Sequence, residues 1–208
     1  MLKITIPSIL IALLLFSCAS QYHVLNPPGI LFDSLETSDP IQFRFKYDIL
    51  TYRSNTKLAK KEDKKGIKIL GIEITNNSGT DLIFDEDIKV KSGTKTVRLM
   101  DVGNIHDELK QNVPIYLIYL VLTPLRGNIN NSDGGPSASE QTLTVPYGYA
   151  LGPLLAGINM GVAAKSNNKF FEDLEMHNLK NRIIKNGETV QGIIGIKATT
   201  NIPLKISY

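Results

Sequence analysis

GIKILGIEITNNSG, residues 66–79, is the stretch that decides the fold. Its large apolar residues occupy both faces of an extended chain, and the apolar face changes near Gly71. A central strand buried on both faces explains this pattern, and so does a bulge at Gly71. The final Asn-Asn-Ser-Gly is typical of a tight turn. The sequence therefore predicts a core strand over residues 66–75.

Further short strands are predicted on both sides of this stretch. Residues 43–49 alternate aromatic or aliphatic with polar side chains, which indicates a strand with one buried face. Apolar pairs follow at short intervals in residues 82–99, and the same pattern returns at 190–196 and 204–208. Regularly spaced short strands with turn signals are typical of a sandwich or barrel. Between them, the charged run at residues 57–65 is expected to be a solvated loop, with contact to lipid phosphates as the alternative.

Three segments together resemble a known kind of domain. GIEITNNSGTDLIF, IKNGETVQGIIGIK and PLKISY resemble small immunoglobulin-like envelope domains of bacteria, in particular of Bacteroidetes-like lipoproteins. The resemblance implies an antiparallel β-sandwich and brings no catalytic residues with it. We therefore predict a mainly β fold, α+β overall, in which an immunoglobulin-like sandwich carries a helical insertion.

The chain divides on this basis into five parts. Residues 41–103 and 183–208 are expected to build the sandwich, and residues 104–182 a largely helical insertion with a mobile loop at 126–142. Residues 113–125 fit a helix or a strand, because apolar side chains occupy nearly every position. Pro153 fits a helix start, and Asn167 or Asn168 fits the cap of a further helix. Residues 18–40 are expected to be a tether, unless residues 30–32 pack on the body.

The beginning of the chain has the composition of a lipoprotein signal peptide. An apolar run of about 13 residues is short for a bilayer span and fits a signal-peptide core. It leads to Leu15-Phe16-Ser17-Cys18, which resembles the bacterial lipobox and contains the only cysteine. The resemblance implies that residues 1–17 are removed and that Cys18 is acylated. An ordinary secretory signal cut after Ala19, or an uncleaved anchor, are the alternatives.

Composition and charge limit the classes of molecule that this chain is expected to bind. A formal charge of +3 and a pI of about 8.8 are far from the concentrated basic patch of a nucleic-acid binder, so no nucleic acid is expected. The expected partners are the membrane, through acylated Cys18, and an envelope protein. No acidic run follows Cys18, whereas such a run in Bacteroidetes-like lipoproteins resembles a surface-export signal. The predicted location is therefore the bacterial outer membrane, on its periplasmic side.

Sequence signals for catalysis and metal binding are few. The zinc-helix motif, the nucleophile elbow and the phosphate loop are all absent, so neither a cofactor nor a metal site is expected. Asp173 and His177, four residues apart, fit an ordinary side-chain pair better than an acid–base or metal site. His106, Asp107 and Glu108 are expected on a solvated surface. Residues 131–140 contain the oxygen ligands of a calcium loop without its first carboxylate, which favours a plain loop.

The Gly-rich apolar segment at residues 148–161 has two interpretations. It is a helix packed closely on the sandwich, or an exposed apolar surface that meets lipid or a partner. For the second interpretation the candidate residues are Tyr147, Tyr149, Leu151, Leu154, Leu155 and Met160. The sequence thus predicts a non-enzymatic binding or scaffolding module with an unknown ligand. The alternatives are an envelope hydrolase that holds His106 or His177 beside a carboxylate in a pocket, and a lipid carrier with an apolar cavity.

Overall fold

The computed structural model describes residues 18–32, 34–38, 40–131, 141–146 and 148–208, which form two compact units. The helical unit contains the described residues up to Ser20 and Asn112–Lys165. The β unit contains Gln21–Gln111 and Ser166–Tyr208. The chain is mixed α+β, and its sheets are antiparallel. The helical unit is shorter than the insertion expected at residues 104–182, and the signal peptide expected at residues 1–17 lies outside the described residues.

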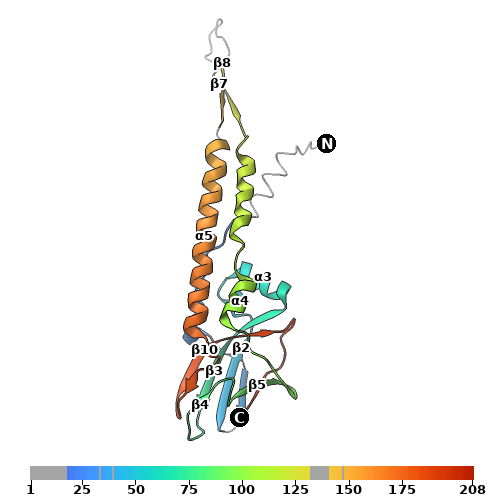
Figure 1. Cartoon of the computed structure of the whole chain (residues 1–208), viewed down its shortest axis with the longest axis vertical. Helices are drawn as coiled ribbons and strands as arrows, with labels where there is room; N and C mark the ends of the chain where they lie inside the picture. The colour runs from blue at the N-terminus through green and yellow to red at the C-terminus, as the bar shows by residue number, and fades with distance from the viewer. Residues whose placement is uncertain (1–17, 33, 39, 132–140, 147) are drawn as a thin grey trace. The chain divides into compact units, whose positions relative to one another are not determined.

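A four-stranded sheet in the order β1-β2-β3-β10 is the centre of the β unit (Figure 1). Its strands are β1 (Ser34–Ser38), β2 (Ile41–Lys46), β3 (Ile67–Asn76) and β10 (Thr189–Lys197). The predicted central strand is confirmed, because β3 lies between two partners and is buried on both faces. Gly71 pairs in an unbroken register with Ile193 and Lys46, so β3 has no bulge there.

Two smaller sheets complete the β unit. β11 (Lys205–Ser207), β5 (Lys89–Ser92) and β6 (Lys95–Thr96) form one, and β4 (Leu82–Ile83) pairs with β9 (Ile183–Ile184) in the other. The largest apolar cluster joins side chains of the central sheet, such as Phe43 and Ile72, with Val90 and Ile206 of the small sheet. The closing strand expected at residues 204–208 is confirmed in β11.

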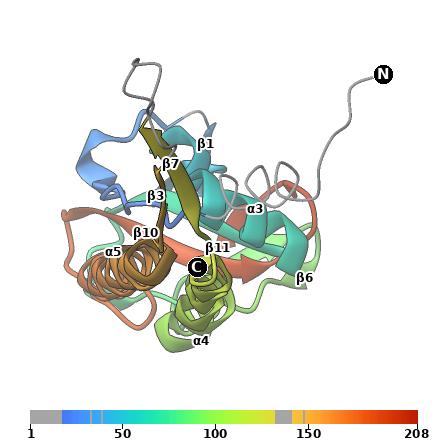
Figure 2. The same cartoon turned by 90° about the horizontal axis from the view of Figure 1, so that it is seen from above.

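The helices of the β unit correct two predictions made from the sequence. Besides the last part of a long helix described below, they are the 3-10 helix η1 (Pro27–Gly29) and the α-helices α2 (Ile49–Tyr52), α3 (Thr56–Lys65) and α4 (Val102–Leu109). The charged run at residues 57–65 is therefore a helix and not a loop; α3 packs against β3 and buries Leu58, Ala59 and Glu62 (Figure 2). The strand expected over residues 43–49 ends at Lys46, because the chain turns at Asp48 with a φ of 55° and begins α2.

The segment after Cys18 is not the expected tether. Tyr22, Leu25 and Ile30 are buried in the second apolar cluster of the β unit. β1 adds an edge to the central sheet by pairing with β2. Residues 21–32 and 34–38 therefore belong to the folded body, as the alternative interpretation of residues 30–32 allowed.

The helical unit contains a 3-10 helix, a hairpin and the first part of a long helix. These are η2 (Val113–Leu122), the strands β7 (Gly127–Asn131) and β8 (Gln141–Val145), and α5 (Gly148–His177). η2 resolves the choice between helix and strand at residues 113–125. α5 runs without interruption, so Pro153 lies inside it rather than at its start. Asn167 is not a cap either, because its side chain bonds the backbone N–H and C=O of Gln111 within the β unit.

Candidate functional site

The predicted lipidation residue lies at the surface of the helical unit. Cys18 is exposed, and the Tyr119 hydroxyl lies 3.9 Å from its Sγ. The next residue is fixed on α5, since the Ala19 N–H donates to Asn159 Oδ1 at 2.7 Å. Asn159 is itself buried and donates from Nδ2 to the Leu155 carbonyl at 2.8 Å. The backbone beside the thiol is therefore held in place while the thiol stays accessible.

Within this unit η2 runs beside the first part of α5, seen in Figure 1 as the yellow-green and orange helices below β7 and β8. Two glycines permit the close approach. A Cβ at Gly152 would lie 3.0 Å from the Tyr119 carbonyl oxygen, and one at Gly148 would overlap the Leu122 carbonyl. Tyr116, Tyr119, Leu122, Ala156 and Ala163 form the small buried cluster between the helices. The space between the two helices is thus filled by the small residues Ala156 and Ala163 and by the large residues Tyr116, Tyr119 and Leu122.

The outside of the helical unit is apolar. Among the described residues, nine of the fifteen exposed large apolar side chains lie here, although the unit is the smaller of the two. They are Ile115, Leu117, Ile118, Leu120, Val121, Tyr149, Leu151, Leu154 and Ile158. Of the predicted interaction residues, Tyr149, Leu151 and Leu154 are exposed, whereas Leu155 and Met160 pack partly against the internal cluster. Tyr147 lies outside the described residues.

The exposed residues of η2 were missed by sequence reasoning, because every position of that segment is apolar and no periodicity marks a face. The distribution of charged residues along the sequence nevertheless marks this segment. Residues 111–125 and 141–164 contain no Asp, Glu, Lys or Arg, in a chain that is 21% charged. The outer face of a helix in water normally carries such residues. The exposed residues of η2 and of the first part of α5 therefore form a surface without charged side chains.

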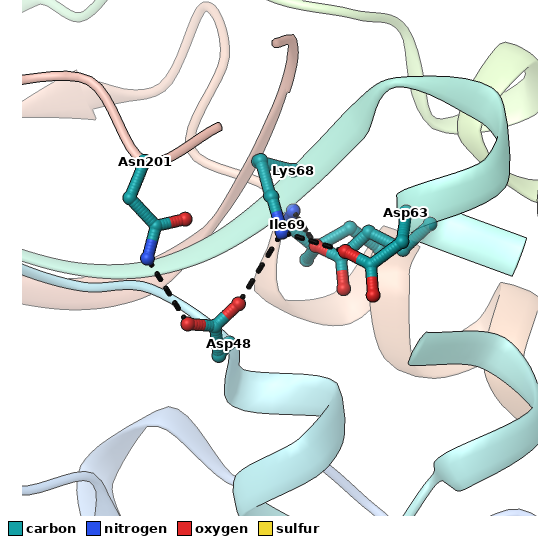
Figure 3. Close-up of polar contacts among 6 residues, drawn as sticks. Asp48, Asp63, Lys68, Ile69 and Asn201 are labelled. Carbon is teal, nitrogen blue, oxygen red and sulfur yellow. Dashed lines mark hydrogen bonds and ion pairs between the residues drawn. The ribbon is translucent and has the colours of Figure 1, made fainter. Parts of the chain in front are cut away.

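The β unit holds a polar cluster at the junction of α2, α3 and β3, in which Lys68 and Glu62 are buried and the other members are exposed. Figure 3 shows Lys68 between the carboxylates of Asp63, 2.8 Å from its Nζ, and Asp48, 3.4 Å away. Asn201 Nδ2 donates to the other oxygen of Asp48 at 3.1 Å. Glu62 is almost fully buried beside them and accepts the Ile69 N–H at 2.5 Å. Sequence reasoning missed this cluster, since residues 57–65 were not expected to form a helix.

Burial and charge act on the ionisation of this cluster. Burial is the largest influence on Glu62 and raises the pKa of its carboxyl to about 7, although the Ile69 N–H and Lys68 lower it in part. For Lys68, burial lowers the pKa, but the hydrogen bond with Asp63 and the nearby carboxylates outweigh it and raise the pKa. Lys68 therefore stays protonated, and the carboxylates of Asp63 and Asp48 balance its charge. This is the state of a structural ion pair and not of a nucleophile.

A pocket of about 430 Å³ opens beside the cluster. It is lined by Phe45, Lys46, Tyr47, Asp48, Thr51, Tyr52 and Asn201. The Lys46 ammonium and the Arg53 guanidinium each lie 5.2 Å from the centre of the Tyr52 ring, so this ring is engaged with cations. The pocket can accept a small polar ligand through hydroxyl, amide and charged groups. A second pocket, of about 490 Å³, lies between α4 and the end of β10 and is also lined mainly by polar residues.

The histidines do not line either of these pockets. His177 Nε2 lies 3.4 Å from Asp173 Oδ1, and the other oxygen of Asp173 accepts the Tyr22 hydroxyl at 2.5 Å and the Leu25 N–H at 2.8 Å. The His106 ring packs edge-on against Phe171, and burial lowers the pKa of its imidazole. The expected solvated surface at residues 106–108 is therefore wrong for His106 itself. The hydrolase alternative required His106 or His177 beside a carboxylate in a pocket, and neither of the two pockets described above contains a histidine.

The Asp173 contacts lead to a test of its structural role. Asp173→Asn is expected to lower the free energy of unfolding by about 2 kcal/mol, because the buried Tyr22 hydroxyl and Leu25 N–H then donate to a neutral amide oxygen instead of a carboxylate, and the contact of the second carboxylate oxygen with His177 is lost. Urea unfolding followed by circular dichroism measures the loss. The matched control is Glu175→Gln at an exposed position of the same helix, expected to change stability by less than about 0.5 kcal/mol. Equal stabilities of the two variants would contradict the assignment.

The described residues contain no group of three or more His, Cys, Asp or Glu side chains that could hold a metal ion. The calcium-loop oxygens at Asp133 and Glu140 lie outside those residues. Across the same described part of the chain, no helix combines the length and the apolar character that a membrane span requires. Comparisons with protein-family models, with curated proteins and with solved structures found no match.

Proposed function

We propose that this chain is a lipid-anchored protein of the bacterial cell envelope, in which acylated Cys18 holds the helical unit on the membrane and the β unit acts as a non-enzymatic binding or scaffolding module. The single observation that carries the proposal is the position of Cys18. Its exposed thiol lies in the unit whose outer surface is apolar and whose helical sequence is almost free of charge.

The chemistry of the anchor supports this location. A lone cysteine in an oxidising compartment has no internal disulfide partner, and thioether formation uses it. Each acyl methylene buried in a bilayer contributes about 0.8 kcal/mol, so two or more chains hold a protein firmly. The outer membrane, on its periplasmic side, is the proposed location, with the bilayer and an envelope protein as partners.

The proposed binding module is an immunoglobulin-like sandwich variant. Support comes from the apolar cluster that joins the sheet β1-β2-β3-β10 to the sheet β11-β5-β6. Its polar pocket beside Asp48 and Asn201 is the proposed place for a small ligand. A non-enzymatic role fits the state of the nearest charged groups, since Lys68, Asp48 and Asp63 are bound to one another.

The lipid anchor is tested by labelling cells with a fatty-acid analogue. The wild-type protein is expected to take up the label and to partition into the detergent phase, whereas Cys18→Ala loses both properties. Ser20→Ala, two residues away, is the matched control and keeps them. Equal labelling of Cys18→Ala and wild type, or a free thiol at Cys18 in the mature wild-type protein, would overturn the proposal.

A further inference from the structure

The helix α3 of the β unit carries all of its lysines on one face. They are spaced by three or four residues, which places their side chains next to one another on an α-helix. The opposite face of α3 is buried at positions 58, 59 and 62. We call the exposed side the lysine face, and its members are Lys57, Lys60, Lys61, Lys64 and Lys65.

The acidic residues of α3 do not neutralise this face. Glu62 is buried in the β unit, and the Asp63 carboxylate bonds Lys68 of β3 at 2.8 Å. Lys65 is the member of the lysine face that pairs with α4, where Glu108 lies 2.9 Å from its Nζ. Within the described part of the chain, the ion pairs that form leave three members without a carboxylate, namely Lys60, Lys61 and Lys64.

The positive charges lie close enough to act on one another. The Lys61 ammonium donates to the Lys110 carbonyl at the end of α4. Burial lowers the pKa of Lys61, and the charges of Lys65, Lys110 and Lys64 lower it further. Like charges at these helical spacings destabilise an isolated helix. The lysine face is therefore not explained by the stability of α3, and it is complementary to an anionic surface.

The chain joins the start of α3 to the segment that follows Cys18. Asn55, which precedes the first turn of α3, is buried and holds His23 through two hydrogen bonds. Its Nδ2 donates to the His23 carbonyl at 2.7 Å, and its Oδ1 accepts the His23 N–H at 2.8 Å. His23 follows Cys18 by five residues, so the chain between them spans at most about 18 Å. The covalent chain thus limits how far the start of α3 can lie from Cys18.

We propose that the lysine face of α3 docks on the anionic phospholipid headgroups of the membrane that holds acylated Cys18. The inference rests on the proposed function, because acylation brings this face within reach of the headgroups. Each lysine near an anionic surface changes the binding constant about fivefold. A tether raises the effective concentration of the two surfaces, so an attraction that is weak between free molecules suffices here.

A fluorophore at the start of α3 reports on docking. Acylation uses Cys18, so Thr56→Cys, at an exposed position of α3, supplies the only free thiol, and it is labelled with NBD. The acylated protein is reconstituted into vesicles that contain a lipid with a nitroxide on its headgroup. One set of vesicles is phosphatidylcholine alone, and the other is phosphatidylcholine mixed with phosphatidylglycerol. Circular dichroism checks that every variant is folded.

Two triple variants separate the lysine face from the net charge. Lys60, Lys61 and Lys64 are changed to Gln in the first, which keeps a good helix former at each position. The matched control changes three lysines of the small sheet β11-β5-β6 to Gln, so it removes the same charge elsewhere in the β unit. These control positions are Lys91, Lys95 and Lys205.

The anionic vesicles are expected to quench position 56 about twofold or more above the neutral vesicles. The excess is expected to vanish at about 1 M salt, where the Debye length is about 3 Å. It is also expected to vanish in the α3 triple variant, because three lysines change the docking constant about hundredfold. The control triple variant is expected to keep it.

Three outcomes would overturn the inference. Equal quenching by neutral and anionic vesicles means that the face does not meet the headgroups. An equal loss in both triple variants means that net charge acts, and not this face. Crosslinking of position 56 to a cellular protein, without extra quenching by anionic vesicles, assigns the face to an acidic protein.

The fatty-acid label is measured on the same samples, so the two proposals fail separately. A protein that takes up no label contradicts the lipid anchor. A labelled protein whose position 56 is quenched equally in both kinds of vesicle contradicts only the docking of α3.

Discussion

Gly192→Ala is expected to lower the free energy of unfolding of the β unit by about 3 kcal/mol, the upper part of the range for overpacked cores. Gly192 lies in β10 and pairs with Ile72 in the central strand. A Cβ at this position would overlap the His177 carbonyl oxygen and the Leu179 side chain. The carbonyl belongs to the backbone where the chain leaves α5, and Asn178 forms a bridge to Ile193 there. Neither segment can move away without losing its pairing.

Gly103→Ala is the matched control for this prediction. Gly103 lies in α4 of the same unit, and a Cβ there would meet no atom within 4 Å. Alanine in a helix is more favourable than glycine by about 0.5–1 kcal/mol, so this variant is expected to be slightly more stable than the parent. Urea unfolding of the three proteins measures the difference. A Gly192→Ala protein as stable as the parent would show that the chain after α5 does not cross β10 at close range.

The structure gives roles to the turn and the glycines of IKNGETVQGIIGIK, residues 184–197, which includes Gly192. Gly187 adopts a φ of 77° in the turn, and the Glu188 carboxylate accepts the Lys185 N–H at 2.8 Å. Thr189 and Thr75 are bonded through their hydroxyls at 2.8 Å across the two strands. These are backbone and pairing functions.

The central strands were predictable because their pattern is local. Alternation in β2 and apolar residues on both faces of β3 follow from period-two geometry alone. The helix α3 was missed because residues 57–65 contain five lysines and only two apolar residues. Those two, Leu58 and Ala59, lie one turn before Glu62 and are too few to show a helical pattern. The tether prediction failed for a long-range reason: Leu25 is held by Asp173, and no local pattern reveals a partner 148 residues away.

Only the parts of the candidate site that depend on local sequence were predictable, as for the fold. Cys18 and the exposed residues of α5 come from a motif and from composition, which are local. The polar cluster requires Asp48, Lys68 and Asn201 to meet, and the turn at Asp48 and the chain before β11 bring them together. Charge is the one signal that was present and unused, since the absence of Asp, Glu, Lys and Arg from residues 111–125 marks η2 as strongly as α5.

Glu62→Gln is expected to change the pH dependence of stability more than any other single substitution in the polar cluster. The carboxyl has a pKa of about 7 in the folded protein, mainly because of burial, against 4.5 as its ordinary value. The folded state therefore holds this proton more tightly than the unfolded state. Between pH 4.5 and 7 the contribution of Glu62 to stability falls as pH rises, by about 3 kcal/mol at about 1.4 kcal/mol per pKa unit. Below pH 4.5 the contribution is constant.

Glutamine removes this titration and keeps an oxygen that accepts the Ile69 N–H. Relative to the parent, Glu62→Gln is expected to gain about 3 kcal/mol between pH 4.5 and pH 8, whatever the difference between the two proteins at pH 4.5. Lys68, Asp48 and Asp63 are present in both proteins, so their own effects on stability largely cancel in the comparison. Glu86→Gln, at an exposed position of the β unit, is the control and is expected to change by less than about 0.5 kcal/mol over the same interval. Urea unfolding at five or six pH values gives both curves, and parallel curves for Glu62→Gln and the parent would mean that Glu62 is ionised in the folded protein near pH 4.5, as an exposed carboxyl is.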